Sequence, residues 1–340
     1  MDLITLRREA ELALPDTVYQ RYGDSPTVKS YTDWSVFERV LSARNYSPGE
    51  VAGASPVDSL PRFSFDPSSH RALAYHFSRL PAFFSWDGSP RVVSASRYGH
   101  SAQHFYVHVR GKRELVLEDV AAVSSKTLTL DVFIEEGGAL LLNHFLHGGH
   151  PQYTHLRVHL GRGASFTGRL AVLGRNAHVR YDVFLHRRGA DFSLSGLSVT
   201  GRSDVVTNAT VCSERSSVNV RHLLLSSPGD FLVHRGVLRV DRPASAAAVE
   251  MDSAFITSGG FVAAVPQLEV LTDRVRRATH KVRDAGLSTE QLFYMLSRGI
   301  SEETAWALYV ERFAETLLGE MCRDGRVVSA LRSFSKTLQR

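Results

Sequence analysis

The chain alternates apolar and polar residues in short segments over residues 111–266, and turn-forming residues separate these segments at an almost constant interval. Residues 155–160 and 179–185 are examples in which every second side chain is apolar. Alternation with a period of two indicates β-strands with one buried face. The turn positions return about every 13 residues. They are Gly111, Ser124, Gly137, Gly149, Arg162, Arg175, Arg188, Arg202, Arg215, Gly229 and Arg242.

This regular interval distinguishes between two all-β architectures. Stacked coils repeat at a fixed length, whereas a sandwich is built from hairpins, and the repeat contains no Asn-Gly hairpin dipeptide. The sequence therefore predicts a mainly β protein whose centre is a right-handed parallel β-helix, or solenoid.

The segments on either side of the repeat have different patterns. Residues 1–45 predict two amphipathic helices, and prolines recur through residues 48–67 among Gly and Ser, which is typical of a linker. A short helix is predicted over residues 70–80, and residues 267–270 are predicted to form the last strand. We expect a helical region and linker over residues 1–67, the β-helix over 68–270 and a helical domain over 271–340.

The predicted C-terminal helices begin at recognisable caps. Ser288 and Gln291 have the spacing of a capping box, and Ser301 can cap a second helix whose apolar positions, three or four apart, form one stripe. The stripe contains Trp306, Tyr309 and Phe313, which suit either packing on the end of the solenoid or a partner's groove. A third helix is plausible over residues 326–338.

Composition limits the compartment and the partners. The chain has 340 residues, a net charge of +5 and two cysteines, too few for a disulfide framework or a Cys-only metal site. It has neither a secretion signal nor an apolar run of about 18 residues, so we expect a cytoplasmic protein that does not enter membranes. The basic residues are mostly arginines that recur with the turns instead of clustering, so nucleic acid is not expected as a partner.

Two sets of histidines could carry metal chemistry. In the run from His144 to His159, His155 and His159 lie four residues apart on one strand face, about 13 Å and too far to share one metal ion unless another coil supplies a ligand. A solvated or stacked histidine ladder is the simpler interpretation. His280 stands alone among basic neighbours, which favour the neutral imidazole that binds metals. It is the single candidate metal ligand, although a lone histidine is often structural.

Motifs of common enzymes are absent from the sequence. It contains neither a P-loop nor a dinucleotide-binding glycine motif, and the acidic residues of the repeat do not pair at a fixed offset as a polysaccharide-cleaving β-helix would require. A β-helical carbohydrate-active enzyme remains the alternative function from the enzyme class, and an assay of polysaccharide cleavage would identify it. We predict no catalytic residues.

One C-terminal stretch resembles a known family. Residues 266–270, His280 and residues 291–305 resemble the SufB/SufD family, the β-helical scaffold subunits of iron–sulfur cluster assembly. The resemblance covers about residues 240–320 and implies that His280 matches the histidine that both subunit types carry. In SufD-type subunits this histidine is implicated in cluster assembly.

The matching positions favour one subunit type. Met251 stands where SufB-type subunits carry a cysteine, and methionine has no thiolate to offer. Thr279 and Lys281 replace the glutamates that flank the histidine in SufB-type subunits, and Ala278 replaces a cysteine found in many SufD-type subunits. The chain is therefore expected to be SufD-like, with a reduced set of ligands.

The resemblance implies a complete functional hypothesis. The chain would be a non-catalytic scaffold that pairs with a SufB-type subunit or with itself, and its C-terminal helices would dock the SufC ABC-type ATPase. Trp306, Tyr309 and Phe313 are the expected partner-binding residues. An iron–sulfur cluster would be bound transiently, at His280 and with ligands from the partner. A purely structural scaffold without a role in cluster chemistry is a further alternative. The sequence does not decide whether Cys212 is ever a ligand.

Overall fold

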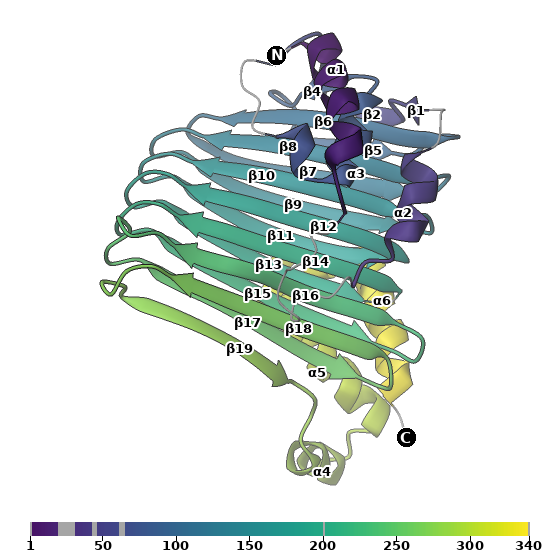
Figure 1. Cartoon of the computed structure of the whole chain (residues 1–340). Coiled ribbons are helices and arrows are strands. Elements are labelled where there is room, and N and C mark those ends of the chain that lie inside the picture. Colours follow the sequence, from purple (N-terminus) through teal and green to yellow (C-terminus); the bar gives the residue numbers. More distant parts are fainter. Residues whose placement is uncertain (1, 20–30, 43–45, 61–64, 200, 339–340) are drawn as a thin grey trace.

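The computed structural model describes residues 2–19, 31–42, 46–60, 65–199 and 201–338. Two parallel sheets face each other and are stacked coil upon coil, which confirms the predicted β-helix (Figure 1). The chain alternates between the sheets, so even-numbered strands from β4 onward form one and odd-numbered strands from β5 onward form the other. We call these the even sheet and the odd sheet.

The strands of the even sheet are mostly nine or ten residues long and pair in register. They are β4 (Phe83–Ser85), β6 (His100–Val109), β8 (Lys126–Ile134), β10 (Gln152–Leu160), β12 (Asn176–Leu185), β14 (Arg202–Val211), β16 (Phe231–Val240) and β18 (Phe261–Val270). The odd sheet runs alongside. It contains β5 (Arg91–Ala95), β7 (Lys112–Ala121), β9 (Ala139–Gly148), β11 (Ser165–Gly174), β13 (Asp191–Val199), β15 (Ser217–Ser226), β17 (Ala248–Thr257) and β19 (Arg277–Asp284).

Three short strands lie in the proline-rich stretch that was predicted as a linker. They are β1 (Tyr46–Ser47), β2 (Glu50–Ala52) and β3 (Ser55–Val57). β2 pairs antiparallel with β5 and β3 pairs antiparallel with β4, so both sheets begin with a three-residue strand of opposite direction. The first end of the solenoid is therefore formed by short strands.

The solenoid core lies between the two sheets. Inward side chains of each coil stack on those of the next, as Leu156 and Val158 of β10 stack on Tyr181 and Val183 of β12. All four are almost completely buried. The predicted alternation is thus confirmed, because every second residue of a strand points into the core.

Turns between coils fall where the sequence predicted them. Gly137 and Gly163 adopt positive φ angles of 68° and 58°, which glycine reaches without the strain that a Cβ causes. Their amides donate to the carbonyls of Arg162 and Arg188 in the neighbouring coil. Backbone hydrogen bonds therefore continue through the turns, and the arginine side chains at these turns remain in solvent.

Helices cover the outer faces of both sheets (Figure 1). α1 (Leu3–Ala13), α2 (Trp34–Leu41) and α3 (Arg71–Ser78) pack on the even sheet. α5 (Glu302–Leu318) and α6 (Gly325–Ser335) pack on the odd sheet through an apolar cluster. α4 (Thr289–Ser297) stands apart, beyond the last coil. Short 3₁₀ turns are Leu14–Asp16, Pro67–Ser69, Gly319–Arg323 and Lys336–Leu338.

The helix caps follow the sequence prediction. Ser288 and Gln291 form the reciprocal capping box of α4, and the Ser301 hydroxyl accepts from the Thr304 amide at the start of α5. Among the described helices, none has the length and apolar character needed to cross a membrane.

Candidate functional site

The last coil of the solenoid leaves two strand edges open. The odd sheet continues beyond the strand predicted to be the last, because β19 pairs with β17. In the described part of the chain, β18 and β19 have one strand neighbour each within their sheets. Their side chains are half-buried or exposed, whereas the inward side chains of the preceding coils are buried. The solenoid therefore ends in two unpaired edges, which are templates for pairing with another chain.

His280 lies in this open coil. It is in register with Met251 of β17, which is fully buried in the core, so the imidazole continues an inward column of side chains at the point where that column opens. Its Nδ1 lies 3.0 Å from the carbonyl oxygen of Pro266 in β18. Since a carbonyl oxygen only accepts hydrogen bonds, Nδ1 carries the proton.

This tautomer leaves the Nε2 lone pair of His280 available. A ligating histidine typically donates its other ring N–H to a carbonyl or carboxylate, which fixes the ring and the tautomer. The contact with Pro266 meets that requirement. The sequence alone could not reveal this contact, because Pro266 and His280 lie in different sheets and the turn between the sheets brings them together.

The surroundings of His280 offer no complete site for an iron–sulfur cluster. Met251 provides a buried thioether and Ala278 provides no ligand at all, whereas a cluster typically needs about four protein ligands. Across the described residues, no three His, Cys, Asp or Glu side chains converge so as to hold a metal ion. Among the described residues at the open end, His280 is the candidate ligand.

The edge of β18 has a gap in its donors. Phe261 and Leu271 donate their amides to the side of β16, so the alternation of a strand turns the even-numbered amides toward the open edge. Pro266 is one of these even-numbered residues, but proline has no N–H. The edge of β18 therefore lacks one donor near its middle, as is usual for prolines that natural sheets place on edges.

The histidine run from His144 to His159 is dispersed by the fold. His144 points into the solenoid, with its Nδ1 3.1 Å from the Tyr181 hydroxyl. His155 is buried under the N-terminal helices and binds Asp182 at 2.8 Å. His159 packs in a stack of aromatic rings on the outer face, with its Nδ1 3.2 Å from His186 Nε2. These three histidines are close in sequence but lie in three different environments.

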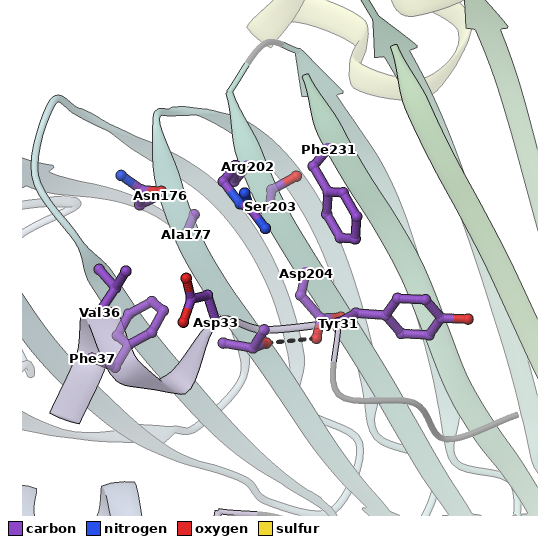
Figure 2. Close-up of a pocket in the computed structure, with 11 residues that line it drawn as sticks. Tyr31, Asp33, Val36, Phe37, Asn176, Ala177, Arg202, Ser203, Asp204 and Phe231 are labelled. Atoms are coloured by element: carbon purple, nitrogen blue, oxygen red, sulfur yellow. Dashed lines mark hydrogen bonds between the residues drawn. The ribbon is translucent and has the colours of Figure 1, made fainter. Parts of the chain in front are cut away.

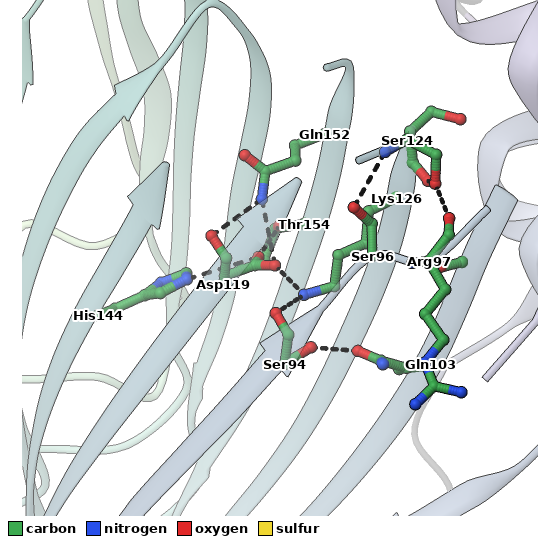
Figure 3. A network of polar contacts seen from close by, with 12 residues as sticks. Ser94, Ser96, Arg97, Gln103, Asp119, Ser124, Lys126, His144, Gln152 and Thr154 are labelled. Carbon is green, nitrogen blue, oxygen red and sulfur yellow. Dashed lines mark hydrogen bonds and ion pairs between the residues drawn. The ribbon is translucent and has the colours of Figure 1, made fainter. Parts of the chain in front are cut away.

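A buried ion pair occupies the interior of the early coils (Figure 3). The Lys126 ammonium binds the Asp119 carboxylate and the Ser94 carbonyl, and both charged side chains are almost fully buried. Thr154 donates to the other Asp119 oxygen at 2.6 Å. Burial opposes ionisation of Asp119, but Lys126 and His144 hold the pKa of its carboxyl below its usual value. The two charges therefore compensate each other in the interior of the solenoid.

A small crevice lies where the segment before α2 crosses the even sheet (Figure 2). Thr32 donates to Asp204 at 2.8 Å, and the Arg202 guanidinium lies over the Phe231 ring at 4.9 Å. The volume of the crevice is about 20 Å³, which is space for about one water molecule. The crevice is too small for a substrate and belongs to the packing of the N-terminal segment.

The C-terminal helices present two different apolar surfaces. Trp306, Tyr309 and Phe313, the predicted partner-binding residues, are half-buried against the odd sheet, and the Tyr309 hydroxyl donates to the Ala285 carbonyl at 2.7 Å. On α4, which buries none of its residues, Phe293 and Tyr294 are 71% and 60% exposed. The sequence analysis did not select these two residues, although their apolar character beside a capping box was visible.

Comparisons with known proteins agree with the resemblance noted in the sequence. A family described as "SUF system FeS cluster assembly, SufBD core domain" matches residues 96–313. An iron-sulfur cluster assembly SufBD family protein of Staphylococcus saprophyticus is 33% identical over 99 residues, and one of Staphylococcus aureus (strain USA300) is 32% identical over 99 residues. Each of these alignments covers 28% of this chain and spans 21% of the length of the relative.

Proposed function

Because the chain belongs to the SufBD core domain family of the SUF system, we propose that it is a non-catalytic, SufD-like scaffold subunit of iron–sulfur cluster assembly in the cytoplasm. The cluster is cargo that is built on the assembled complex. The observation that carries the proposal is His280 at the open end, with its Nδ1 bound to the Pro266 carbonyl and its Nε2 available.

The open coil is the proposed subunit interface. Two unpaired edges beside His280 allow a partner strand to continue a sheet and to bring its own ligands to the imidazole. A cluster then needs thiolates from that partner, because Met251 and Ala278 supply none. The missing thiolate at Met251 is also the reason to class the chain as SufD-like.

The experiment compares cluster assembly with and without the imidazole. The protein alone should hold no stable cluster after anaerobic reconstitution with iron and sulfide. Together with a SufB-type subunit, it should yield cluster, and His280→Ala should lower the bound iron and sulfide severalfold while the complex still forms. Unchanged iron content in the His280→Ala complex would assign the protein to the purely structural alternative.

Docking of a SufC-type ATPase is proposed at α4. α4 contacts α5 but buries none of its own residues, so the exposed rings of Phe293 and Tyr294 can enter an apolar groove of a partner. Trp306, Tyr309 and Phe313 would then support the surface from behind, since they already pack on the odd sheet.

A pair of matched variants tests the ATPase site. Phe293→Asp should abolish copurification with the ATPase, whereas Leu12→Asp, at a side chain that is 70% exposed on α1, should not. Both changes add one carboxylate to an equally exposed apolar position, so equal effects would place the ATPase elsewhere.

A further inference from the structure

The outward row of β19 contains cations and no acid. Strand alternation turns Arg277, Thr279, Lys281 and Arg283 to the outer face, and the three cationic side chains are 52%, 54% and 53% exposed. A strand that pairs beside β19 would place its own outward row directly against these cations.

The matching acids lie behind the cations. Glu250 binds Arg277 at 3.3 Å and Lys281 at 3.5 Å, and Asp252 binds Arg283 at 3.5 Å. Both carboxylates belong to β17 and are only 15% exposed. Two acids of β17 thus pair with three cations of β19. A further strand that pairs with the open edge of β19 would lie beside these cations and away from the two acids.

A second copy of this chain fits poorly in the first of two symmetric arrangements. If β19 pairs antiparallel with β19 of the copy, outward residues oppose outward residues, so cations and Thr279 face cations and Thr279 in every such register. When the register centres on His280, Arg277 opposes Arg283 twice. Like charges placed directly opposite each other destabilise a strand pair.

The second symmetric arrangement pairs β19 with β18 of the copy. The outward row of β18 is Phe261, Ala263, Val265, Gln267 and Glu269. Its one carboxylate already binds Arg239 at 3.4 Å. The same edge lacks a donor at Pro266, so this pairing is weak in charge and in hydrogen bonding.

We propose that Arg277, Lys281 and Arg283 select the partner of the open end: β19 pairs with the edge strand of a different subunit whose outward row is acidic, and it rejects a second copy of this chain. The inference rests on the proposed function, which makes the open end a subunit interface. The three cations are specificity determinants and take no part in holding the cluster.

A charge-reversed copy of the same chain can stand in for the acidic partner. The triple variant Arg277→Glu, Lys281→Glu, Arg283→Glu is mixed with the unmodified protein, and dimer formation is measured by sedimentation at low ionic strength. The mixed dimer should form at least tenfold more tightly than the unmodified protein associates with itself. Its affinity should fall as salt rises, because salt screens exposed charges.

Two further variants make the measurement specific. Because reversed charges beside Glu250 and Asp252 could loosen β19, a neutral variant with Gln at the same three positions is measured too, and it should associate with itself more tightly than the unmodified protein. The control reverses three turn cations, Arg162, Arg175 and Arg188, and should gain no affinity for the unmodified protein.

Two outcomes would contradict this inference alone, and a third would also contradict the proposed interface. If the unmodified protein dimerises through the open end as tightly as the mixed pair, charge selection is wrong while the interface stands. If the neutral variant associates more weakly than the unmodified protein, the cations attract a second copy and the inference is likewise wrong. If every mixture stays monomeric, the open edge of β19 is not a pairing surface, and both are contradicted.

Discussion

The two ends of the solenoid differ in how their strand edges are treated. At the first end, β2 and β3 are three residues long and run against their neighbours, and the N-terminal helices pack beside them. At the last end, β18 has ten residues and β19 has eight, and both are straight continuations of their sheets. Very short edge strands discourage pairing with other chains, whereas long exposed edges invite it.

The two ends also differ in how well their inward side chains are buried. The early coils bury charged and imidazole groups together with their partners, as in the Lys126–Asp119 pair, His76 of α3 and His104 of β6. The last coil leaves His280 and Val282 exposed on its inward column. The first end is therefore covered by the chain's own segments, while the last end leaves two long edges that the proposed subunit interface would cover.

Acid should produce the largest loss of stability. Burial lowers the pKa of His100, His104 and His178 to about 3, so these imidazoles stay neutral in the folded protein. The unfolded chain takes up protons near pH 6.5, so it binds more protons than the folded protein below that pH, and stability falls as pH falls. We expect several kcal/mol to be lost between pH 7 and pH 5, because each such histidine approaches a contribution of about 1.4 kcal/mol per pH unit once the pH is below its unfolded pKa.

Denaturant unfolding at the two pH values measures this loss, and pH 8.5 is the control. Raising the pH from 7 to 8.5 should change stability little, since the histidines are neutral in both states there. Equal stability at pH 7 and pH 5 would show that the early coils do not bury neutral imidazoles.

A charge placed in the core should distinguish a closed coil from the open one. Val183 is 1% exposed and Val282 is 47% exposed, although both point inward. Val183→Asp should cost about 3–5 kcal/mol, because it buries an unpaired carboxylate. Val282→Asp should cost about 1 kcal/mol or less, because its carboxylate stays in water. Thermal unfolding of the two variants would contradict the assignment of the open coil if the losses were equal.

Breaking the buried ion pair should have a similar or slightly smaller effect. Lys126→Met leaves Asp119 ionised and unpaired inside the solenoid, and we expect a loss of about 3–5 kcal/mol. Adding Asp119→Leu to Lys126→Met should recover most of that loss, since the two apolar side chains need no partner. A double variant as unstable as the single one would show that the remaining network depends on both charges.

The sequence predicted the solenoid well because the relevant signals are local. Alternation and turn spacing follow directly from which residues point into the closed core. The strand that the sequence prediction missed, β19, lies in the open coil, where no coil above it requires apolar side chains. Its alternating pattern is therefore weak for the same physical reason that makes it a candidate interface. The short strands β2 and β3 were missed because their pairing depends on distant residues.

The candidate site was predicted in part. The position of His280 was selected from a resemblance, but its tautomer depends on the Pro266 carbonyl, which only the folded turn brings within reach. The aromatic stripe of α5 was recognised from its helical spacing, yet spacing alone could not show which face the solenoid occupies. The cations of β19 were visible in the sequence, but their exposure in front of Glu250 and Asp252 appears only in the fold.

The smallest effect on stability is expected from removing His280. His104, fully buried and 2.7 Å from the Thr129 hydroxyl, provides the reference at the first end of the solenoid. His104→Ala should cost about 2–4 kcal/mol, since it opens a cavity and leaves a buried hydroxyl with fewer partners. His280→Ala removes one exposed hydrogen bond and should change the free energy of unfolding by about 0.5 kcal/mol or less. Chemical unfolding at pH 7 measures both. A loss of several kcal/mol for His280→Ala would make that histidine a structural residue, and the open end would then resemble the closed one.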